Sequence, residues 1–172
     1  MDVTEAIATR LELKEYADEP VDAGTKRAIL DAARLAPSGQ NRQHWRFILL
    51  DDPDDLDRLA ELSPSGQWIR GVDFAVLVLT DPTYRPHELD AGRTVTHMQL
   101  EAWHRGVGSR IYTGVDEAAA RDWLGYPEDR EVTLVVGFGR PTRPVASFQG
   151  RKDRQPLEDV AFHGAYGHPL DL

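Results

Sequence analysis

The feature that most constrains the fold is an uninterrupted apolar run, Phe-Ala-Val-Leu-Val-Leu, at residues 74–79. It is far shorter than the roughly 20 apolar residues that a membrane-spanning helix needs. A short run that is apolar at every position is typical of a strand buried on both faces, because a half-buried strand alternates apolar and polar side chains. The sequence therefore predicts an α/β (α+β) fold in which helices cover both sides of a small sheet.

The pattern around this run supplies the other elements. Apolar residues at helical spacing predict a helix in the first dozen residues, and Asp22 is a suitable N-cap for a second helix that Pro37 and Gly39 stop. We expect further strands at residues 45–50, 109–112 and 132–137 beside the one at 74–80, and further helices at 53–62, at 88–105 and from the cap Asp116 through 124. The sheet is expected to be mixed.

The chain after Arg140 has a different character. It is rich in Pro, Arg, Gly and His and shows no sustained periodicity, so it cannot fold by itself. No linker or internal repeat divides the sequence, and we expect a single domain over residues 1–172. The part from about residue 140 onward is then an extended arm that packs on something else, such as a second subunit.

Composition excludes several classes of function. The chain has 20 basic and 29 acidic side chains and a formal net charge of −9, which argues against binding to nucleic acid or to an anionic membrane surface. It has no cysteine, so redox chemistry would need a cofactor. The N-terminus lacks the basic and apolar regions of a secretory leader, and we expect a cytoplasmic protein.

Familiar catalytic motifs are not met. Gly106-Val-Gly108 follows a helix and Gly137-Phe-Gly139 runs into a proline, so neither is a dinucleotide-binding turn; we interpret them as a helix C-cap and a strand exit. His97 and His104 share a helix face but lack a third metal ligand, which favours a surface or interface stripe. No Gly-x-Ser-x-Gly elbow of a serine hydrolase is present.

One segment does indicate ligand binding. Residues 36–45 form a helix stop that carries Ser38, Gln40, Asn41 and Gln43 directly before a strand, and these hydroxyl and amide groups suit a polar heterocycle. Arg10 and Lys14, spaced one helical turn apart, and the tail residues Arg151, Lys152 and Arg154 could enclose a phosphate. Taken separately, each of these basic residues is better explained as a solvated surface charge.

Four ordered blocks resemble the nitroreductase family of flavin mononucleotide (FMN) enzymes, from about residue 4 to residue 160. They are Arg10-Leu-Glu-Leu-Lys14-Glu-Tyr16 with Pro20-Val21; Ala32-Ala-Arg-Leu-Ala-Pro37-Ser38 with Asn41, Gln43 and Trp45; Asp90-Ala-Gly92 leading to Gly106-Val-Gly-Ser109 and Thr113-Gly114; and Gly125-Tyr-Pro-Glu128, Gly139-Arg-Pro141 and Lys152-Asp-Arg-Gln-Pro-Leu-Glu158. The second block is the most specific.

The resemblance implies a nitroreductase-like fold and an interlocked homodimer with exchange of C-terminal arms, one flavin lying at each interface. It implies phosphate binding by Arg10, Lys152 and Arg154, with Lys14 near the phosphate and the pyrimidine edge of the ring. The positions that match the family's other phosphate donors hold Leu11 and Glu12. The loop residues Pro37, Ser38, Gly39 and Asn41 would come from the other subunit, and the backbone of Thr113 and Gly114 would face N5 of the ring.

Two departures from the family pattern affect these expectations. A carboxylate at Glu12 would repel a phosphate and weaken flavin binding, unless neighbouring cations outweigh it or it turns away to pair with one of them. The connection formed by residues 80–87 is too short to contain the inserted helices that many relatives place over the flavin. The site should therefore be open or covered by something else.

The leading hypothesis is an FMN-dependent oxidoreductase that passes a hydride from NAD(P)H through flavin N5 to a small acceptor in a ping-pong cycle. No side-chain nucleophile is required, since the flavin carries the chemistry. Nitroaromatics, quinones and activated alkenes all remain open as acceptors. The alternative is a flavin-binding or flavin-free protein without redox turnover on the same fold.

Overall fold

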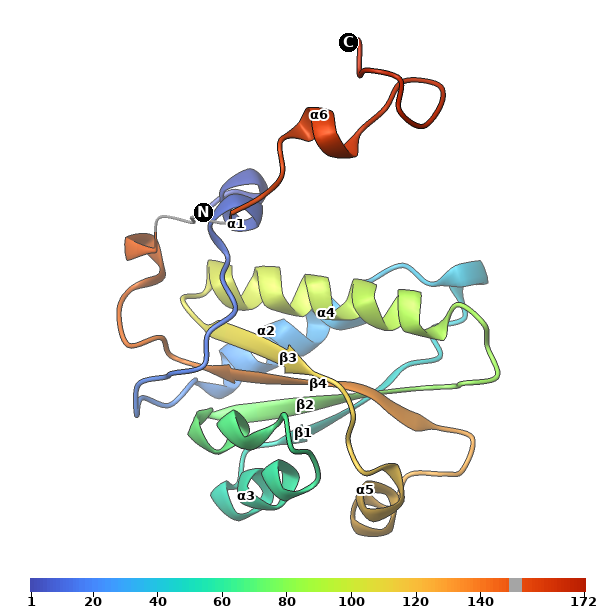
Figure 1. Ribbon diagram of the computed structural model, residues 1–172. Helices are drawn as coiled ribbons and strands as arrows, with labels where there is room; N and C mark the ends of the chain where they lie inside the picture. Colours follow the sequence, from blue (N-terminus) through green and yellow to red (C-terminus); the bar gives the residue numbers. More distant parts are fainter. Residues whose placement is uncertain (149–152) are drawn as a thin grey trace.

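The computed structural model describes residues 1–148 and 153–172, and its centre is a four-stranded sheet (Figure 1). The strands are β1 (Arg46–Leu50), β2 (Phe74–Thr80), β3 (Gly108–Tyr112) and β4 (Glu131–Gly139). Each begins and ends within two residues of its expected position. Their order is β1-β2-β4-β3, and all three neighbouring pairs are antiparallel. The expectation of a mixed sheet is therefore wrong, because apolar periodicity locates a strand but does not encode its direction.

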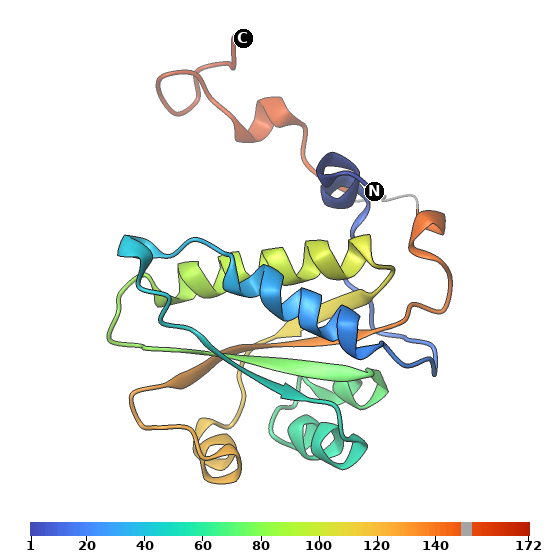
Figure 2. The same ribbon diagram turned by 180° about the vertical axis from the view of Figure 1, so that it is seen from behind.

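Helices cover both faces of this sheet (Figures 1 and 2). One face carries α2 and α4, whereas α3, α5 and a 3-10 helix lie on the other face. The helices are α1 (Val3–Thr9), α2 (Ala23–Arg34), α3 (Pro53–Glu61), α4 (His87–His104), α5 (Glu117–Leu124) and α6 (Leu157–Val160), with 3-10 helices η1 (Gly39–Asn41), η2 (Gln67–Gly71) and η3 (Val145–Ser147). The expected α+β architecture with helices on both sides is confirmed.

The apolar run in β2 is buried at all of its positions. Phe74, Val76 and Val78 belong to the core cluster that includes residues of α2 and α4. The intervening Ala75, Leu77 and Leu79 belong to the cluster on the other face, with residues of α3, η2 and α5. Both faces of the central strand are thus desolvated, which is why the run contains no polar position.

The expected helix signals act as anticipated. The Asp22 carboxylate accepts the backbone N–H of Thr25 at 2.9 Å, and the Asp116 carboxylate accepts that of Ala119 at 3.1 Å. Gly106 ends α4 with φ of 74°, a left-handed conformation that glycine adopts without strain. These caps fix one end each of α2, α5 and α4.

The N-terminal segment differs from expectation. The first helix ends at Thr9, so Arg10 and Lys14 do not lie on one helical face. Residues 10–16 run instead along the outer edge of β3, where Leu13 N–H donates to the carbonyl of Ser109 at 3.1 Å. A parallel bridge joins Glu12 to Ser109, and an antiparallel one joins Tyr16 to Pro141. Pairing with an open strand edge has outweighed the helical periodicity of the segment.

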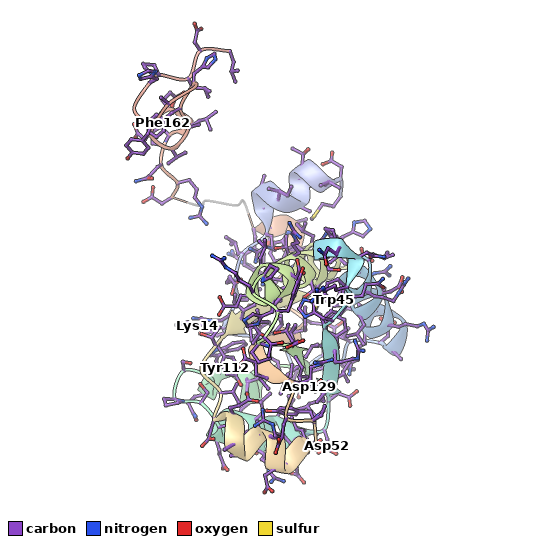
Figure 3. All side chains as sticks on the ribbon, turned by 90° about the vertical axis from the view of Figure 1, so that its right-hand side faces the viewer. Lys14, Trp45, Asp52, Tyr112, Asp129 and Phe162 are labelled. Carbon is purple, nitrogen blue, oxygen red and sulfur yellow. The ribbon has the colours of Figure 1, made fainter. Side chains whose placement is uncertain are left out.

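The tail has two parts. Residues up to Phe148 stay with their own chain, since Phe148 is buried beside Trp103 with ring centroids 5.6 Å apart. Residues 153–172, which include α6, project beyond the sheet and its helices (Figures 1 and 2). Figure 3 shows the labelled Phe162 in this projecting part, well away from the body. Nearly all of the tail's side chains are exposed in the single chain.

Candidate functional site

The Glu12 carboxylate is held in place by three donors. Its carboxylate accepts the Gln99 side-chain amide at 2.8 Å and the Ile111 backbone N–H at 3.1 Å, and it pairs with Arg10 at 3.2 Å. Gln99 comes from α4 and is buried, so this contact fastens the N-terminal segment to the helix. The carboxylate has turned toward these partners, one of the two outcomes that the sequence left open.

Two other cations lie beside a cavity of about 270 Å³ next to this segment. Lys14 and Arg143 both line it, together with Glu12, Leu13, Glu15, Thr142 and Phe148. The Arg143 guanidinium lies 4.2 Å from the centre of the Phe148 ring, a cation–π contact that fixes its place. Among the described residues neither Lys14 nor Arg143 forms an ion pair. We call Arg10, Lys14 and Arg143 the cationic group.

Sequence patterns did not identify Arg143 as a candidate ligand, because it is one of many arginines in an irregular region. Leu11, in contrast, packs against the apolar cluster of Ala6, Trp103 and Phe148 and supports the segment from below. Arg154 lies in the projecting tail, exposed, and donates to the carbonyl of Asp153 at 2.9 Å. Lys152 falls outside the described residues.

Tyr16 anchors the end of the segment that carries Lys14. Its hydroxyl donates to the Leu13 carbonyl at 2.8 Å, and its ring fills the space that a Cβ on Gly139 would occupy, while the Leu13 side chain fills that at Gly108. Burial and, to a smaller extent, the nearby Glu12 charge raise the pKa of the Tyr16 hydroxyl well above its usual range. The hydroxyl therefore remains a hydrogen-bond donor throughout the physiological range.

Thr113 and Gly114 follow directly after β3. Gly114 has φ of 83°, and the Ser65 hydroxyl donates to the Thr113 carbonyl at 3.4 Å. At a rise of about 3.3 Å per residue, Thr113 lies about 13 Å along the strand from Ser109, where the N-terminal segment pairs. The cationic group and the Thr113 backbone are thus spread along the same edge of the sheet.

The loop of residues 38–44 lies elsewhere, between α2 and β1. The Ser38 hydroxyl accepts the Gln43 backbone N–H at 2.9 Å, and the Ser38 carbonyl accepts that of Asn41 at 3.0 Å. Gln40, Asn41 and Gln43 have φ of 55°, 54° and 47°. Holding a non-glycine residue in this left-handed backbone conformation costs on the order of 1 to 3 kcal/mol, and such residues cluster at functional sites. Pro37, which precedes the loop, lines a separate surface groove with residues of α4.

Asp90, near the start of α4, fastens this loop. Its carboxylate is almost fully buried and accepts the Gly39 backbone N–H at 3.1 Å and His44 Nε2 at 3.3 Å. Tyr84, from the short connection before α4, lies against Gly39 and His44. The sequence marked Asp90 as part of a family block but gave no sign of its pairing with His44.

The structure does not bring the two groups of expected ligands together in one chain. Loop 38–44 contacts α4 at Asp90, whereas the N-terminal segment contacts it at Gln99. Nine residues of helix separate these points, or about 14 Å at 1.5 Å per residue. In Figure 3, which looks along α4, Lys14 is labelled on one side of the helix and Trp45, which follows loop 38–44, on the other.

Other kinds of site find no support in the described part of the chain. Its His, Asp and Glu side chains form no group of three or more that could bind a metal ion. His97 instead contacts the Ala32 carbonyl at 3.2 Å and, with His104, lines an apolar groove of about 570 Å³ beside α1. No helix within the described ranges is both long and apolar enough to cross a bilayer.

Comparison with known proteins identifies related chains. The Nitroreductase family profile matches residues 7–83 and 65–140. A Thermus thermophilus protein named NADH dehydrogenase is 40% identical over 169 residues, which cover 91% of this chain and 79% of that protein. An Archaeoglobus fulgidus protein, provisionally named NADH dehydrogenase/NAD(P)H nitroreductase, is 33% identical over 145 residues, covering 78% and 83%.

Solved structures share the fold. The FMN-dependent nitroreductase of Clostridium difficile R20291 superposes with a TM-score of 0.85 at 20% identity, covering 95% of this chain and all of that one (100%). At this identity the match supports the arrangement of helices and strands and does not by itself transfer a ligand.

Proposed function

The chain belongs to the nitroreductase family of oxidoreductases, and from this premise we propose that it is an FMN-dependent homodimer that oxidises NAD(P)H and reduces a small acceptor. One observation carries the proposal: the expected FMN ligands form two groups on opposite sides of α4, and each group is only part of a site. A twofold-related second copy would place loop 38–44 of one chain beside the cationic group of the other.

The side chains present fit FMN. A phosphate monoester carries a charge of about −1.5 to −2 at neutral pH and binds best where cations converge. Lys14 and Arg143 offer positive charges beside a cavity and have no ion-pair partner in the described part of the chain, and Glu12 already has its own donors. Arg154 and Lys152 of the arm would complete the phosphate site.

The remaining ligands would serve the ring. Ser38 and Asn41, from loop 38–44 of the partner, offer hydroxyl and amide groups to its polar edge, while Pro37 and Gly39 shape the loop. When bound, FMN supplies the redox chemistry by accepting a hydride from NAD(P)H at N5 and delivering it to the acceptor in a ping-pong cycle. The Lys14 charge would favour an anionic flavin, and the backbone at Thr113 and Gly114 would line the reactive edge of the ring.

Exposed apolar groups support the dimer. Val3, Leu35 and Leu89 lie on the face formed by α1, α2 and α4 and are each more than half exposed. The projecting tail exposes Leu157 and Val160, and Tyr166 is 91% exposed. Exposed apolar surfaces of this kind mark interaction sites, and a second copy would cover them if the two arms are exchanged.

The proposed acceptor is a nitroaromatic, a quinone or an activated alkene. The connection from β2 to α4 is short and folds back onto loop 38–44 through Tyr84. It adds no helix over the sheet edge, so a flat acceptor could approach the ring. The alternative of a binding protein without turnover rested on repulsion by Glu12, and the pairing of this carboxylate with Arg10, Gln99 and the Ile111 N–H weakens that argument.

The test is an anaerobic titration of the purified, FMN-reconstituted protein with NADH and then NADPH, following loss of the flavin absorbance. Bleaching by either nucleotide, with a dimeric mass in solution, is the expected result. An FMN-loaded protein that stays oxidised with both nucleotides would support the non-redox alternative. A protein that binds no FMN would overturn the cofactor assignment.

A further inference from the structure

A buried carboxylate at the start of α4 joins loop 38–44 to this helix through three donors. Asp90 has 1% of its side chain exposed. Its Oδ2 accepts from Gly39 N–H at 3.1 Å and from His44 Nε2 at 3.3 Å, and its Oδ1 accepts from Arg93 at 3.0 Å. Removing a carboxylate from water is costly unless donors replace the lost hydration. Two of the three donors belong to loop 38–44.

His44 is held in one orientation by this contact. Because a carboxylate oxygen only accepts, Nε2 carries the hydrogen, and Nδ1 has no hydrogen-bond partner among the described residues. The ring is buried, and its centroid lies 4.9 Å from that of Tyr84 in an edge-on contact. The Arg42 guanidinium lies over the same Tyr84 ring, 4.4 Å from its centroid. His44, Tyr84 and Arg42 therefore clamp the end of the loop.

Gly39 is fixed at the other end. A Cβ at this position would collide with the Tyr84 hydroxyl, so the loop backbone passes directly over that group. Between Gly39 and His44 lie the three residues with positive φ, Gln40, Asn41 and Gln43. A strained loop keeps such a conformation only when several contacts with its surroundings hold it in place. Here Asp90 contacts the chain on both sides of the strained residues.

We propose that Asp90 and His44 are positioning residues that hold loop 38–44 in the conformation that binds the flavin ring. The inference rests on the proposed function, since it assigns these two residues to the FMN site of the partner subunit. Neither residue needs to touch the cofactor. They act through the Gly39 backbone and through the Ser38 and Asn41 groups that the loop presents.

The test compares the affinities for FMN and for riboflavin, which has the ring without the phosphate, by quenching of flavin fluorescence. Asp90→Asn and His44→Leu should each weaken both affinities by about 10- to 100-fold, as loss of a supporting contact does at other ligand sites. Because the loop acts on the ring, the ratio of the two affinities should not change. Lys14→Gln should change that ratio.

Two further variants separate positioning from a general loss of structure. His44→Gln keeps an amide donor within reach of Asp90 and should recover most of the affinity lost in His44→Leu. Arg93→Gln is the matched control, because it removes a partner of Asp90 that lies outside the loop, and flavin affinity should stay within about threefold of wild type. Should Asp90→Asn fail to fold, the two His44 variants carry the test.

The outcomes distinguish the two proposals. A wild-type protein that binds neither flavin overturns the FMN assignment and this inference with it. A wild-type protein that binds FMN while Asp90→Asn and His44→Leu bind both flavins equally well overturns only the positioning roles. Equal losses in His44→Leu and His44→Gln would also overturn them, because the donor to Asp90 would then not be what matters.

Discussion

The two sides of α4 carry parts of one proposed site in very different states. Loop 38–44 is fixed within its own chain by Asp90, Tyr84 and hydrogen bonds that Ser38 accepts, and it holds backbone strain of on the order of 1 to 3 kcal/mol at each positive-φ residue. Across the helix, Lys14 and Arg143 line a cavity and form no ion pair within residues 1–148 and 153–172. The loop proposed to bind the flavin ring is therefore preorganised in the single chain. The cationic group proposed to bind the phosphate, in contrast, needs an anion to balance its charge.

The largest effect is expected at the fixed loop. Gly39→Val would drive a branched side chain into the Tyr84 hydroxyl, and we expect FMN affinity to fall about 100-fold, equivalent to ~2.7 kcal/mol. Adding Tyr84→Ala should recover part of the loss. Gly71→Val is the control, because a Cβ there meets no other atom within 4 Å. Wild-type flavin affinity in Gly39→Val would show that the loop is not rigid.

The cationic group should give the next largest effect. Lys14→Gln and Arg143→Gln should each lower FMN affinity about tenfold, the usual loss for a charge-assisted contact, and leave riboflavin affinity unchanged. Added salt should narrow the gap between wild type and variant, because exposed charges are screened. Arg27→Gln, an exposed arginine on α2, is the matched control. If Arg143→Gln behaves like this control, then Arg143 has no part in phosphate binding.

Glu12→Ser tests whether the Glu12 carboxylate hinders phosphate binding at the cationic group. The substitution leaves the buried Gln99 amide without its acceptor, and we expect the free energy of unfolding to fall by about 1 to 2 kcal/mol in urea titrations. FMN affinity should change by less than about twofold, since Glu12 is already engaged. A large gain in affinity would mean that the carboxylate faces the phosphate after all.

The smallest effect concerns the pH dependence of stability. Folding raises the pKa of the Tyr16 hydroxyl above its unfolded value near 10, so its contribution is complete below that pH and is lost as pH rises further. Tyr16→Phe should flatten the fall in unfolding free energy between about pH 10 and 11. Tyr112 and Tyr126 have raised pKa values as well, so some slope should remain. Identical pH profiles for both proteins would contradict the assignment.

Local patterns were enough to place most elements. The apolar run of β2 and the caps at Asp22 and Asp116 each depend on residues close together in the sequence, and each was found where expected. The block around Pro37 and Ser38 likewise located the loop. Strand direction is not a local property, and the sheet proved antiparallel where a mixed one was expected.

The contacts that organise the candidate site could not be predicted in this way. Glu12 meets Gln99 across 87 positions and Ile111 across 99, and His44 meets Asp90 across 46. No periodicity or motif encodes such pairs. Arg143 is recognised only because Phe148 fixes it beside Lys14. Sequence could name the kinds of ligand, but which groups face a ligand depends on tertiary pairing.

The path of residues 10–16 along β3 has a consequence for the behaviour of the chain in a crowded solution. A bare outer strand offers a row of unsatisfied N–H and C=O groups on which other chains can add, the usual start of intermolecular sheet growth. Here Leu13 bonds to a C=O group and Glu12 to an N–H group of that row, and Tyr16 pairs with Pro141 beyond the end of β4. The segment that carries Lys14 thus also protects the edge of β3 from pairing with other chains. Sequence changes in this segment therefore affect both the proposed phosphate site and the protection of the strand edge. Removal of residues 1–16 should promote fibre-like association even where no cofactor is present.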